Sequence, residues 1–133
     1  VAHANGSAKE ELQARVDVAN KADADVFVSI HMDSFVNGSV GGTSTYVYPK
    51  TTGDLRLGSF IRKGLVSQLS TDDRNTRNCN FYVVKFTKMP ATLAEVAFIS
   101  NNTEEKMLKS SAGLDKAARG LLLGLQNYFS NSK

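Results

Sequence analysis

The chain has 133 residues, 41% hydrophobic and 22% charged, which is typical of one globular domain rather than a disordered segment. Its net charge is +3, but no run of Lys or Arg exceeds two residues, so no nucleic-acid-binding stripe is expected. The mild positive charge is that of an ordinary solvated surface or, alternatively, one that attracts an anionic polymer such as a cell wall. The single cysteine, Cys79, excludes an intramolecular disulfide, and no apolar run approaches the roughly 20 residues of a membrane span.

Apolar spacing and turn residues predict alternating helices and strands. Ser7 and Glu10 form a capping box, which predicts the start of a helix. The nearly continuous apolar run Val26–Ile30 is typical of a strand covered on both faces, as in parallel sheets. In chain order, the expected elements are a helix over 8–22, a strand over 26–30, a glycine-rich loop over 36–42, a strand over 43–48 and a helix over 53–70.

The second half of the chain is expected to add two strands and two helices. In chain order these are a polar loop over 71–78, strands over 79–86 and 91–100, a short helix within 101–111 and a closing helix over 112–129. Gly120 and Gly124 in the closing helix are expected to pack closely against the sheet. The apolar side of that helix is expected to be formed by Leu114, Ala118, Leu121, Leu122, Leu125 and Phe129.

This order of elements predicts an α/β fold with a twisted, mostly parallel sheet and helices on both faces. No G-x-G-x-x-G segment follows a predicted strand, so a dinucleotide site is not expected.

His31 is the first candidate functional residue, because it follows a predicted buried strand directly. Ligands of open α/β sheets bind beyond the carboxyl ends of strands, and a neutral imidazole there is a good zinc ligand. The alternative is an ordinary strand-end histidine with a local hydrogen bond. Asp33 is two residues further along, so it either orients the His31 imidazole or belongs to a turn.

Glu95 is the second candidate, because it lies in the otherwise apolar segment ATLAEVAFI. A buried carboxylate is unfavourable unless it is paired, bound to a cation or protonated, and a carboxyl group in such a state suits general acid–base catalysis. The alternatives are a structural salt bridge, with Arg15, Arg74 or Arg77 as partner, and an edge strand on which Glu95 faces solvent. Cys79 is a candidate nucleophile only if a histidine approaches it.

Three stretches of the sequence together resemble a bacterial enzyme family. They are ELQARVDVANKADADVFVSIHMDS, GGTSTYVY and NFYVVKFTKMPATLAEVAFISN. They are similar to segments of the zinc-dependent N-acetylmuramoyl-L-alanine amidases of the amidase-3 type, and the resemblance covers about residues 9–129. It implies a central twisted sheet flanked by helices, as in zinc exopeptidase-like hydrolases. It also implies hydrolysis of the amide between N-acetylmuramic acid and L-alanine of the peptidoglycan stem peptide, in the extracellular cell wall.

By motif match, the resemblance makes His31 a ligand of Zn²⁺ and Glu95 the catalytic glutamate. The family's other two ligands, a histidine and a glutamate, are expected upstream of Val1. We therefore expect residues 1–133 to be the larger, C-terminal part of a single catalytic domain that lacks a strand–helix–strand unit. Asp33 replaces the family's usual asparagine.

Because catalytic zinc normally has three protein ligands, this chain alone is expected to bind zinc poorly and to be inactive. Missing strands would leave an open sheet edge, so association with the N-terminal segment or a dimer is expected. The alternative function is a non-catalytic module with the amidase fold that binds or regulates the cell wall.

Overall fold

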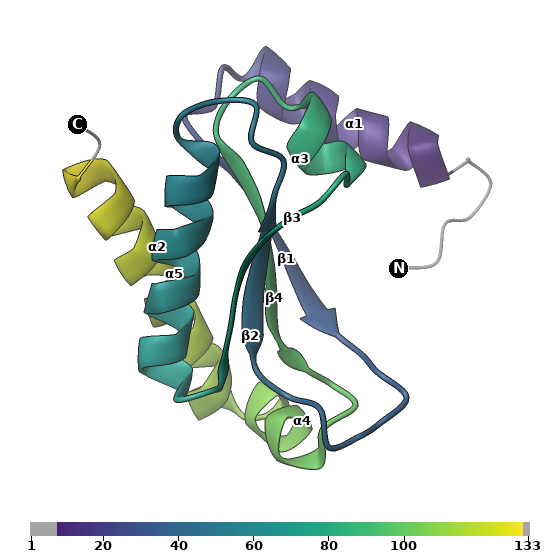
Figure 1. Cartoon of the computed structure of the whole chain (residues 1–133), viewed down its shortest axis with the longest axis vertical. Helices are drawn as coiled ribbons and strands as arrows, with labels where there is room; N and C mark the ends of the chain where they lie inside the picture. The colour runs from purple at the N-terminus through teal and green to yellow at the C-terminus, as the bar shows by residue number, and fades with distance from the viewer. Residues whose placement is uncertain (1–7, 132–133) are drawn as a thin grey trace.

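The computed structural model describes residues 8–131 and shows a four-stranded sheet between two groups of helices (Figure 1). The strands, in chain order, are β1 (Phe27–Asp33), β2 (Thr43–Val47), β3 (Asp73–Asn78) and β4 (Ala91–Phe98). Helices α1 (Ala8–Lys21) and α3 (Tyr82–Phe86) cover one face, and α2 (Asp54–Leu69) and α5 (Ser111–Ser130) cover the other. Helix α4 (Asn102–Lys109) follows β4. Ser7, expected as a helix cap, lies outside the described residues.

The sheet is mixed, in the order β1-β4-β2-β3. β1 pairs with β4 in parallel, β2 pairs with β3 in parallel, and β2 and β4 are antiparallel. The α/β prediction is therefore confirmed, with two of the three pairings parallel. β4 is a central strand and is buried along its length except at Glu95, which is partly exposed.

Alternate side chains of β4 supply the two cores. Ala91 and Leu93 pack with residues of α1 and α3, whereas Ala94 and Val96 pack with α2 and α5. Burial on both faces explains why this strand reads as a nearly continuous apolar run.

Helices α2 and α5 pack with their backbones in contact. A Cβ atom added to Gly64 would lie 2.2 Å from the Gly120 carbonyl oxygen, and one added to Gly124 would lie 2.7 Å from Ile61 Cα. The expected close packing of the α5 glycines thus occurs against α2 rather than against the sheet.

The expected apolar side of α5 was only partly correct, for the same reason: Leu121 and Leu125 pack against the core, but other members of the predicted set do not. Leu114, Leu122 and Phe129 are half exposed, because the small residues let the two helices approach closely. The residues of α5 that are buried are Gly113, Ala117, Gly120, Gly124 and Tyr128.

Two predicted elements differ in the structure. The expected loop over 71–78 contains strand β3, whose backbone pairs with β2 and whose Thr76 hydroxyl lies 2.8 Å from that of Thr45. The expected strand over 79–86 contains the short helix α3. Its Val83 and Val84 are buried, and the Thr87 hydroxyl donates to the Val83 carbonyl at 2.8 Å.

Candidate functional site

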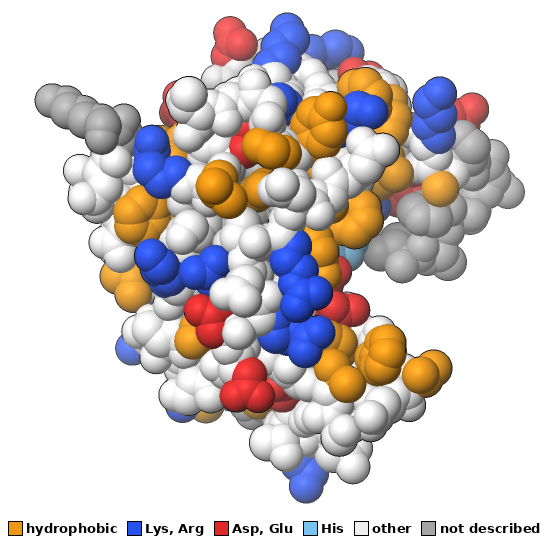
Figure 2. Space-filling view, viewed as in Figure 1, with side chains coloured by type: hydrophobic (Ala, Val, Ile, Leu, Met, Phe, Trp, Pro, Cys, Tyr) orange, Lys and Arg blue, Asp and Glu red, His pale blue; other side chains and the backbone are white. Residues whose placement is uncertain are grey.

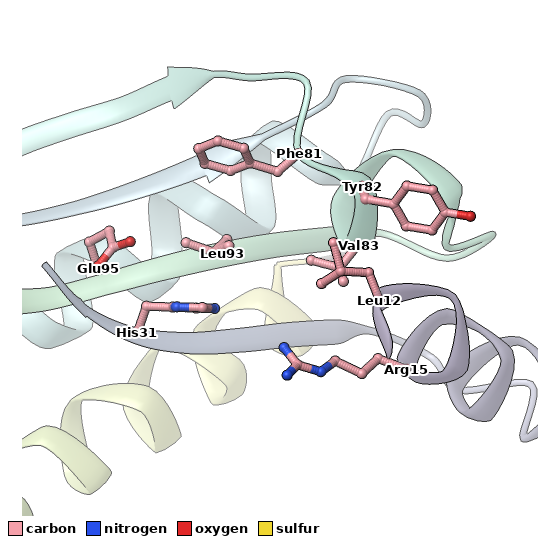
Figure 3. Close-up of a pocket in the computed structure, with 8 residues that line it drawn as sticks. All are labelled: Leu12, Arg15, His31, Phe81, Tyr82, Val83, Leu93 and Glu95. Atoms are coloured by element: carbon pink, nitrogen blue, oxygen red, sulfur yellow. The ribbon is translucent and has the colours of Figure 1, made fainter. Parts of the chain in front are cut away.

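His31 on β1 and Glu95 on β4 are direct partners in the parallel strand pairing. Partners on neighbouring strands project from the same face of a sheet. Both side chains line one cavity of about 290 Å³, and Figure 3 shows them side by side on the two strands. The structure therefore brings together the two residues that the sequence singled out, which lie 64 positions apart.

Helices α1 and α3 supply half of the residues that line the cavity. The remaining lining residues are Leu12, Arg15, Phe81, Tyr82, Val83 and Leu93. The wall is mostly apolar, and Arg15 contributes its positive charge (Figure 3). Sequence reasoning missed Phe81 and Tyr82 as cavity residues because the segment that carries them was read as a strand.

Glu95 has the electrostatic setting expected of a reactive carboxyl group. Burial, and secondarily the nearby charge of Asp33, raises the pKa of Glu95 to about 7. Its Oε2 atom is buried and has no hydrogen-bond partner among the described residues. A salt bridge with Arg15, Arg74 or Arg77 does not occur within that part of the chain, and β4 is not an edge strand.

His31 is held as a neutral imidazole. Burial, and then the charge of Arg15, lowers the pKa of His31. Its Nε2 lies 3.1 Å from the Ser29 hydroxyl oxygen, two residues earlier on the same strand. Neutral imidazole is the form that binds metals.

Asp33 does not orient the His31 ring. A register shift separates it from His31, and its Oδ1 accepts a hydrogen bond from the Ser34 backbone N–H at 2.8 Å. Asp33 instead acts on Glu95 through its charge.

The described residues alone do not form a zinc site. Among residues 8–131 there is no group of three His, Cys, Asp or Glu side chains able to hold a metal ion. His31 and Glu95 are donors of suitable type, but a catalytic zinc ion normally takes three protein ligands.

Cys79 does not have the setting of a nucleophile, because burial raises the pKa of its thiol and so disfavours the reactive thiolate. No described helix combines the length and apolarity that crossing a membrane requires.

Fold and site together define an α/β domain with an imidazole and a carboxyl group side by side at neighbouring parallel strands, an arrangement suited to hydrolysis. Residues 2–127 match the family model described as N-acetylmuramoyl-L-alanine amidase, and the chain belongs to this family.

Two curated proteins of Bacillus subtilis illustrate the relationship. The uncharacterized protein YqiI is 40% identical over 120 residues, covering 89% of this chain and 58% of YqiI. The N-acetylmuramoyl-L-alanine amidase LytC is 39% identical over 121 residues, covering 89% of this chain and 24% of LytC.

The fold of this chain is also similar to that of a solved amidase structure. The catalytic domain of the amidase CwlV from Bacillus (Paenibacillus) polymyxa var. colistinus superimposes with a TM-score of 0.83 at 34% identity, covering 90% of this chain and 65% of that one. This chain therefore spans less than two thirds of CwlV's solved domain and of both curated relatives.

Proposed function

We propose that the protein hydrolyses the amide between N-acetylmuramic acid and the L-alanine of the peptidoglycan stem peptide. The observation that carries this proposal is the pairing of His31 with Glu95 in one cavity of a chain that belongs to the amidase family. LytC, which is similar in sequence, and CwlV, which is similar in sequence and fold, are named for this activity.

Glu95 is the proton carrier of the reaction. Its carboxylate takes a proton from water as the water oxygen bonds to the amide carbonyl carbon. It gives that proton to the amide nitrogen as the carbon–nitrogen bond breaks. The products are a lactyl carboxylate on the sugar and a free amino group on L-alanine. A carboxyl group with a pKa of about 7 is suited to both transfers near neutral pH.

We propose zinc as the cofactor of the intact protein, with His31 as one of its ligands. The two further ligands, a histidine and a glutamate, would come from outside the described residues, because those residues lack a three-ligand group. Bound zinc would polarise the substrate carbonyl and acidify water. On this proposal, residues 1–133 are the larger part of one catalytic domain, and without the other ligands they bind zinc weakly and do not cleave peptidoglycan.

The free side of β1 supports the expected association with another segment. β1 lies at the edge of the described sheet. Its residues Ile30 and Met32 are 53% and 38% exposed, although apolar strand residues are usually covered. We propose that an N-terminal segment of the intact protein, or a second copy, covers this edge, and that the protein acts at the extracellular cell wall on peptidoglycan.

The test is cleavage of purified peptidoglycan by the full-length protein, measured as newly freed N-terminal L-alanine. Glu95→Gln should lower the rate by about a hundredfold or more, because general acid–base groups contribute on that scale. Glu105→Gln is the matched control, since Glu105 is on α4 and its side chain is 44% exposed. Full activity in Glu95→Gln would remove the catalytic role, and an inactive wild type would remove the function.

The second candidate is a non-catalytic module that binds or regulates the cell wall. The missing three-ligand group among the described residues favours it. Zinc stoichiometry of the purified full-length protein separates the two: one zinc per chain supports the amidase, and none supports the module.

A further inference from the structure

A second cavity lies beside the first, and the proposed function does not use it. It has a volume of about 390 Å³ and is lined by Asp33, Phe35, Val40, Tyr46, Arg74 and Phe98. Figure 2 shows that this region of the surface is hollowed and that positive, negative and apolar side chains meet there.

A bulge in the sheet places this second cavity on the same face as Glu95. His31 pairs with Glu95, but two residues later Asp33 pairs with Phe98, three residues along β4. The extra residue turns the Phe98 side chain to the face that Glu95 occupies. Tyr46 of β2 projects from that face as well, because it pairs with Leu93.

The two cavities are neighbours on the face of the sheet from which Glu95 projects. Glu95 lines the first cavity. Asp33, whose charge acts on Glu95, lines the second. The Tyr46 ring in the wall of the second cavity is 5.4 Å from the Phe81 ring in the wall of the first. The reactive carboxyl group therefore lies in one of two neighbouring cavities, an arrangement suited to cleavage of a bond between two unlike groups.

The second cavity has the chemistry of a sugar site. Phe35 and Tyr46 offer ring faces for the apolar C–H face of a pyranose ring, and Asp33 and Arg74 offer an acceptor and donors for hydroxyl and acetamido groups. The Arg74 guanidinium lies 5.2 Å from the centre of the Phe98 ring, and this contact positions it. Within residues 8–131 Arg74 has no ion-pair partner, so its charge is available to a ligand.

The first cavity suits a peptide instead. Its Leu12, Val83 and Leu93 walls match a small apolar side chain such as that of alanine. Arg15 is fixed at the cavity by an ion pair with Glu11 at 2.9 Å, and its remaining N–H groups are the natural partners of a peptide carboxylate.

We propose that the cleft binds its substrate in one direction, with the sugar side of the scissile amide in the Phe35–Arg74 cavity and the peptide side in the Arg15 cavity. This proposal rests on the proposed amidase function and assigns the two sides of the substrate to named residues.

Binding of the two reaction products to the full-length protein tests the proposal without requiring turnover. The probes are glycan strands stripped of stem peptides and a synthetic stem peptide that begins with L-alanine, each titrated by calorimetry. Phe35→Ala should weaken glycan binding about five- to tenfold, the usual effect of losing one aromatic contact, and should change peptide binding less than twofold. Arg15→Gln should do the reverse.

Two matched controls lie on α5, on the other face of the sheet. Phe129 is 49% exposed, against 54% for Phe35, and Arg119 has the same four-residue ion-pair spacing as Arg15, with Asp115 at 2.9 Å. Phe129→Ala and Arg119→Gln should leave both affinities unchanged. The proposal is overturned if Phe35→Ala and Arg15→Gln affect the same ligand, exchange ligands or affect neither, or if the wild type binds neither product. Appearance of newly freed N-terminal L-alanine in peptidoglycan, measured separately, reports on the amidase function itself.

Discussion

Asp54 connects the start of α2 to the start of β4, the strand that carries Glu95. Its side chain is fully buried, and its oxygens accept hydrogen bonds from Lys50 Nζ at 2.8 Å, from the Ala91 backbone N–H at 2.9 Å, and from the backbone N–H and hydroxyl of Thr51. Burial alone would raise the pKa of Asp54, but these hydrogen bonds outweigh it and lower the pKa below the ordinary value. The folded protein therefore holds Asp54 as a carboxylate.

Replacing Asp54 should lower the free energy of unfolding substantially. Asp54→Ala leaves the ammonium group of Lys50, whose side chain is 15% exposed, and the buried Ala91 N–H without their acceptor. Loss of one partner of a buried ion pair costs about 3–5 kcal/mol. Asp54→Asn keeps the shape and one acceptor oxygen, so about 1–3 kcal/mol is expected.

The penalty should depend on pH with a defined sign. Because the pKa of Asp54 is lower in the folded state, the carboxylate stabilises the protein above the unfolded-state pKa of about 4, and this contribution disappears as the pH falls through the folded-state pKa. Urea denaturation followed by circular dichroism should show a difference between wild type and Asp54→Asn that is full at pH 7 and smaller at pH 3. A difference that grows toward acid, or an Asp54→Ala penalty below 1 kcal/mol at pH 7, would refute this reasoning.

Two further stability changes follow from close contacts. Gly64→Ala should lower the free energy of unfolding by about 1–3 kcal/mol in urea titrations, although alanine favours helices, because the new Cβ would meet the Gly120 carbonyl oxygen at 2.2 Å. Glu104→Gln should lower it by about 1–3 kcal/mol in the same assay. The Glu104 carboxylate accepts hydrogen bonds from the Gly42 and Phe98 backbone N–H groups, both at 2.8 Å, and so ties the loop over 36–42 to the end of β4.

Matched variants keep these two tests specific. Lys63→Ala introduces alanine at an exposed position next to Gly64 on α2, and Glu105→Gln removes an exposed carboxylate next to Glu104. Each should change stability by less than about 0.5 kcal/mol. If either control equals its partner, the contact described for that partner is not the cause.

The sequence predicted which two residues would share a site, and the structure places His31 and Glu95 in one cavity, but the sequence did not predict how that cavity is built. An acid within an apolar run and a histidine after another apolar run are both visible in the chain. That His31 and Glu95 are partners is a fact of strand order and register, which arise from contacts between distant segments. The bulge that turns Phe98 toward the same face has no local signal either.

The two elements that were predicted wrongly, β3 and α3, show that tertiary packing can override local sequence patterns. The segment of β3 has a polar sequence without alternation, and it becomes a strand because β2 presents an open edge to it. The segment of α3 carries the β-branched residues Val83 and Val84, which favour strands, yet it forms one helical turn over the core beside α1. Tyr82 lines the cavity as a residue of this helix.

Glu95 itself provides the sharpest test of whether this site was shaped for function. Its Oε2 atom is buried without a hydrogen-bond partner in the described chain, and its pKa is raised to about 7, so the ionised form weakens the fold. Glu95→Gln removes the charge and keeps the shape. Measured in the presence of a chelator at pH 8, it should raise the free energy of unfolding by about 1–2 kcal/mol, as variants that relieve functional strain do.

The same substitution should slow cleavage by about a hundredfold or more, so stability and activity would move in opposite directions. A structural residue would lose both together. If Glu95→Gln were less stable than the wild type, Glu95 would have a stabilising partner, and its burial would be explained by packing rather than by catalysis.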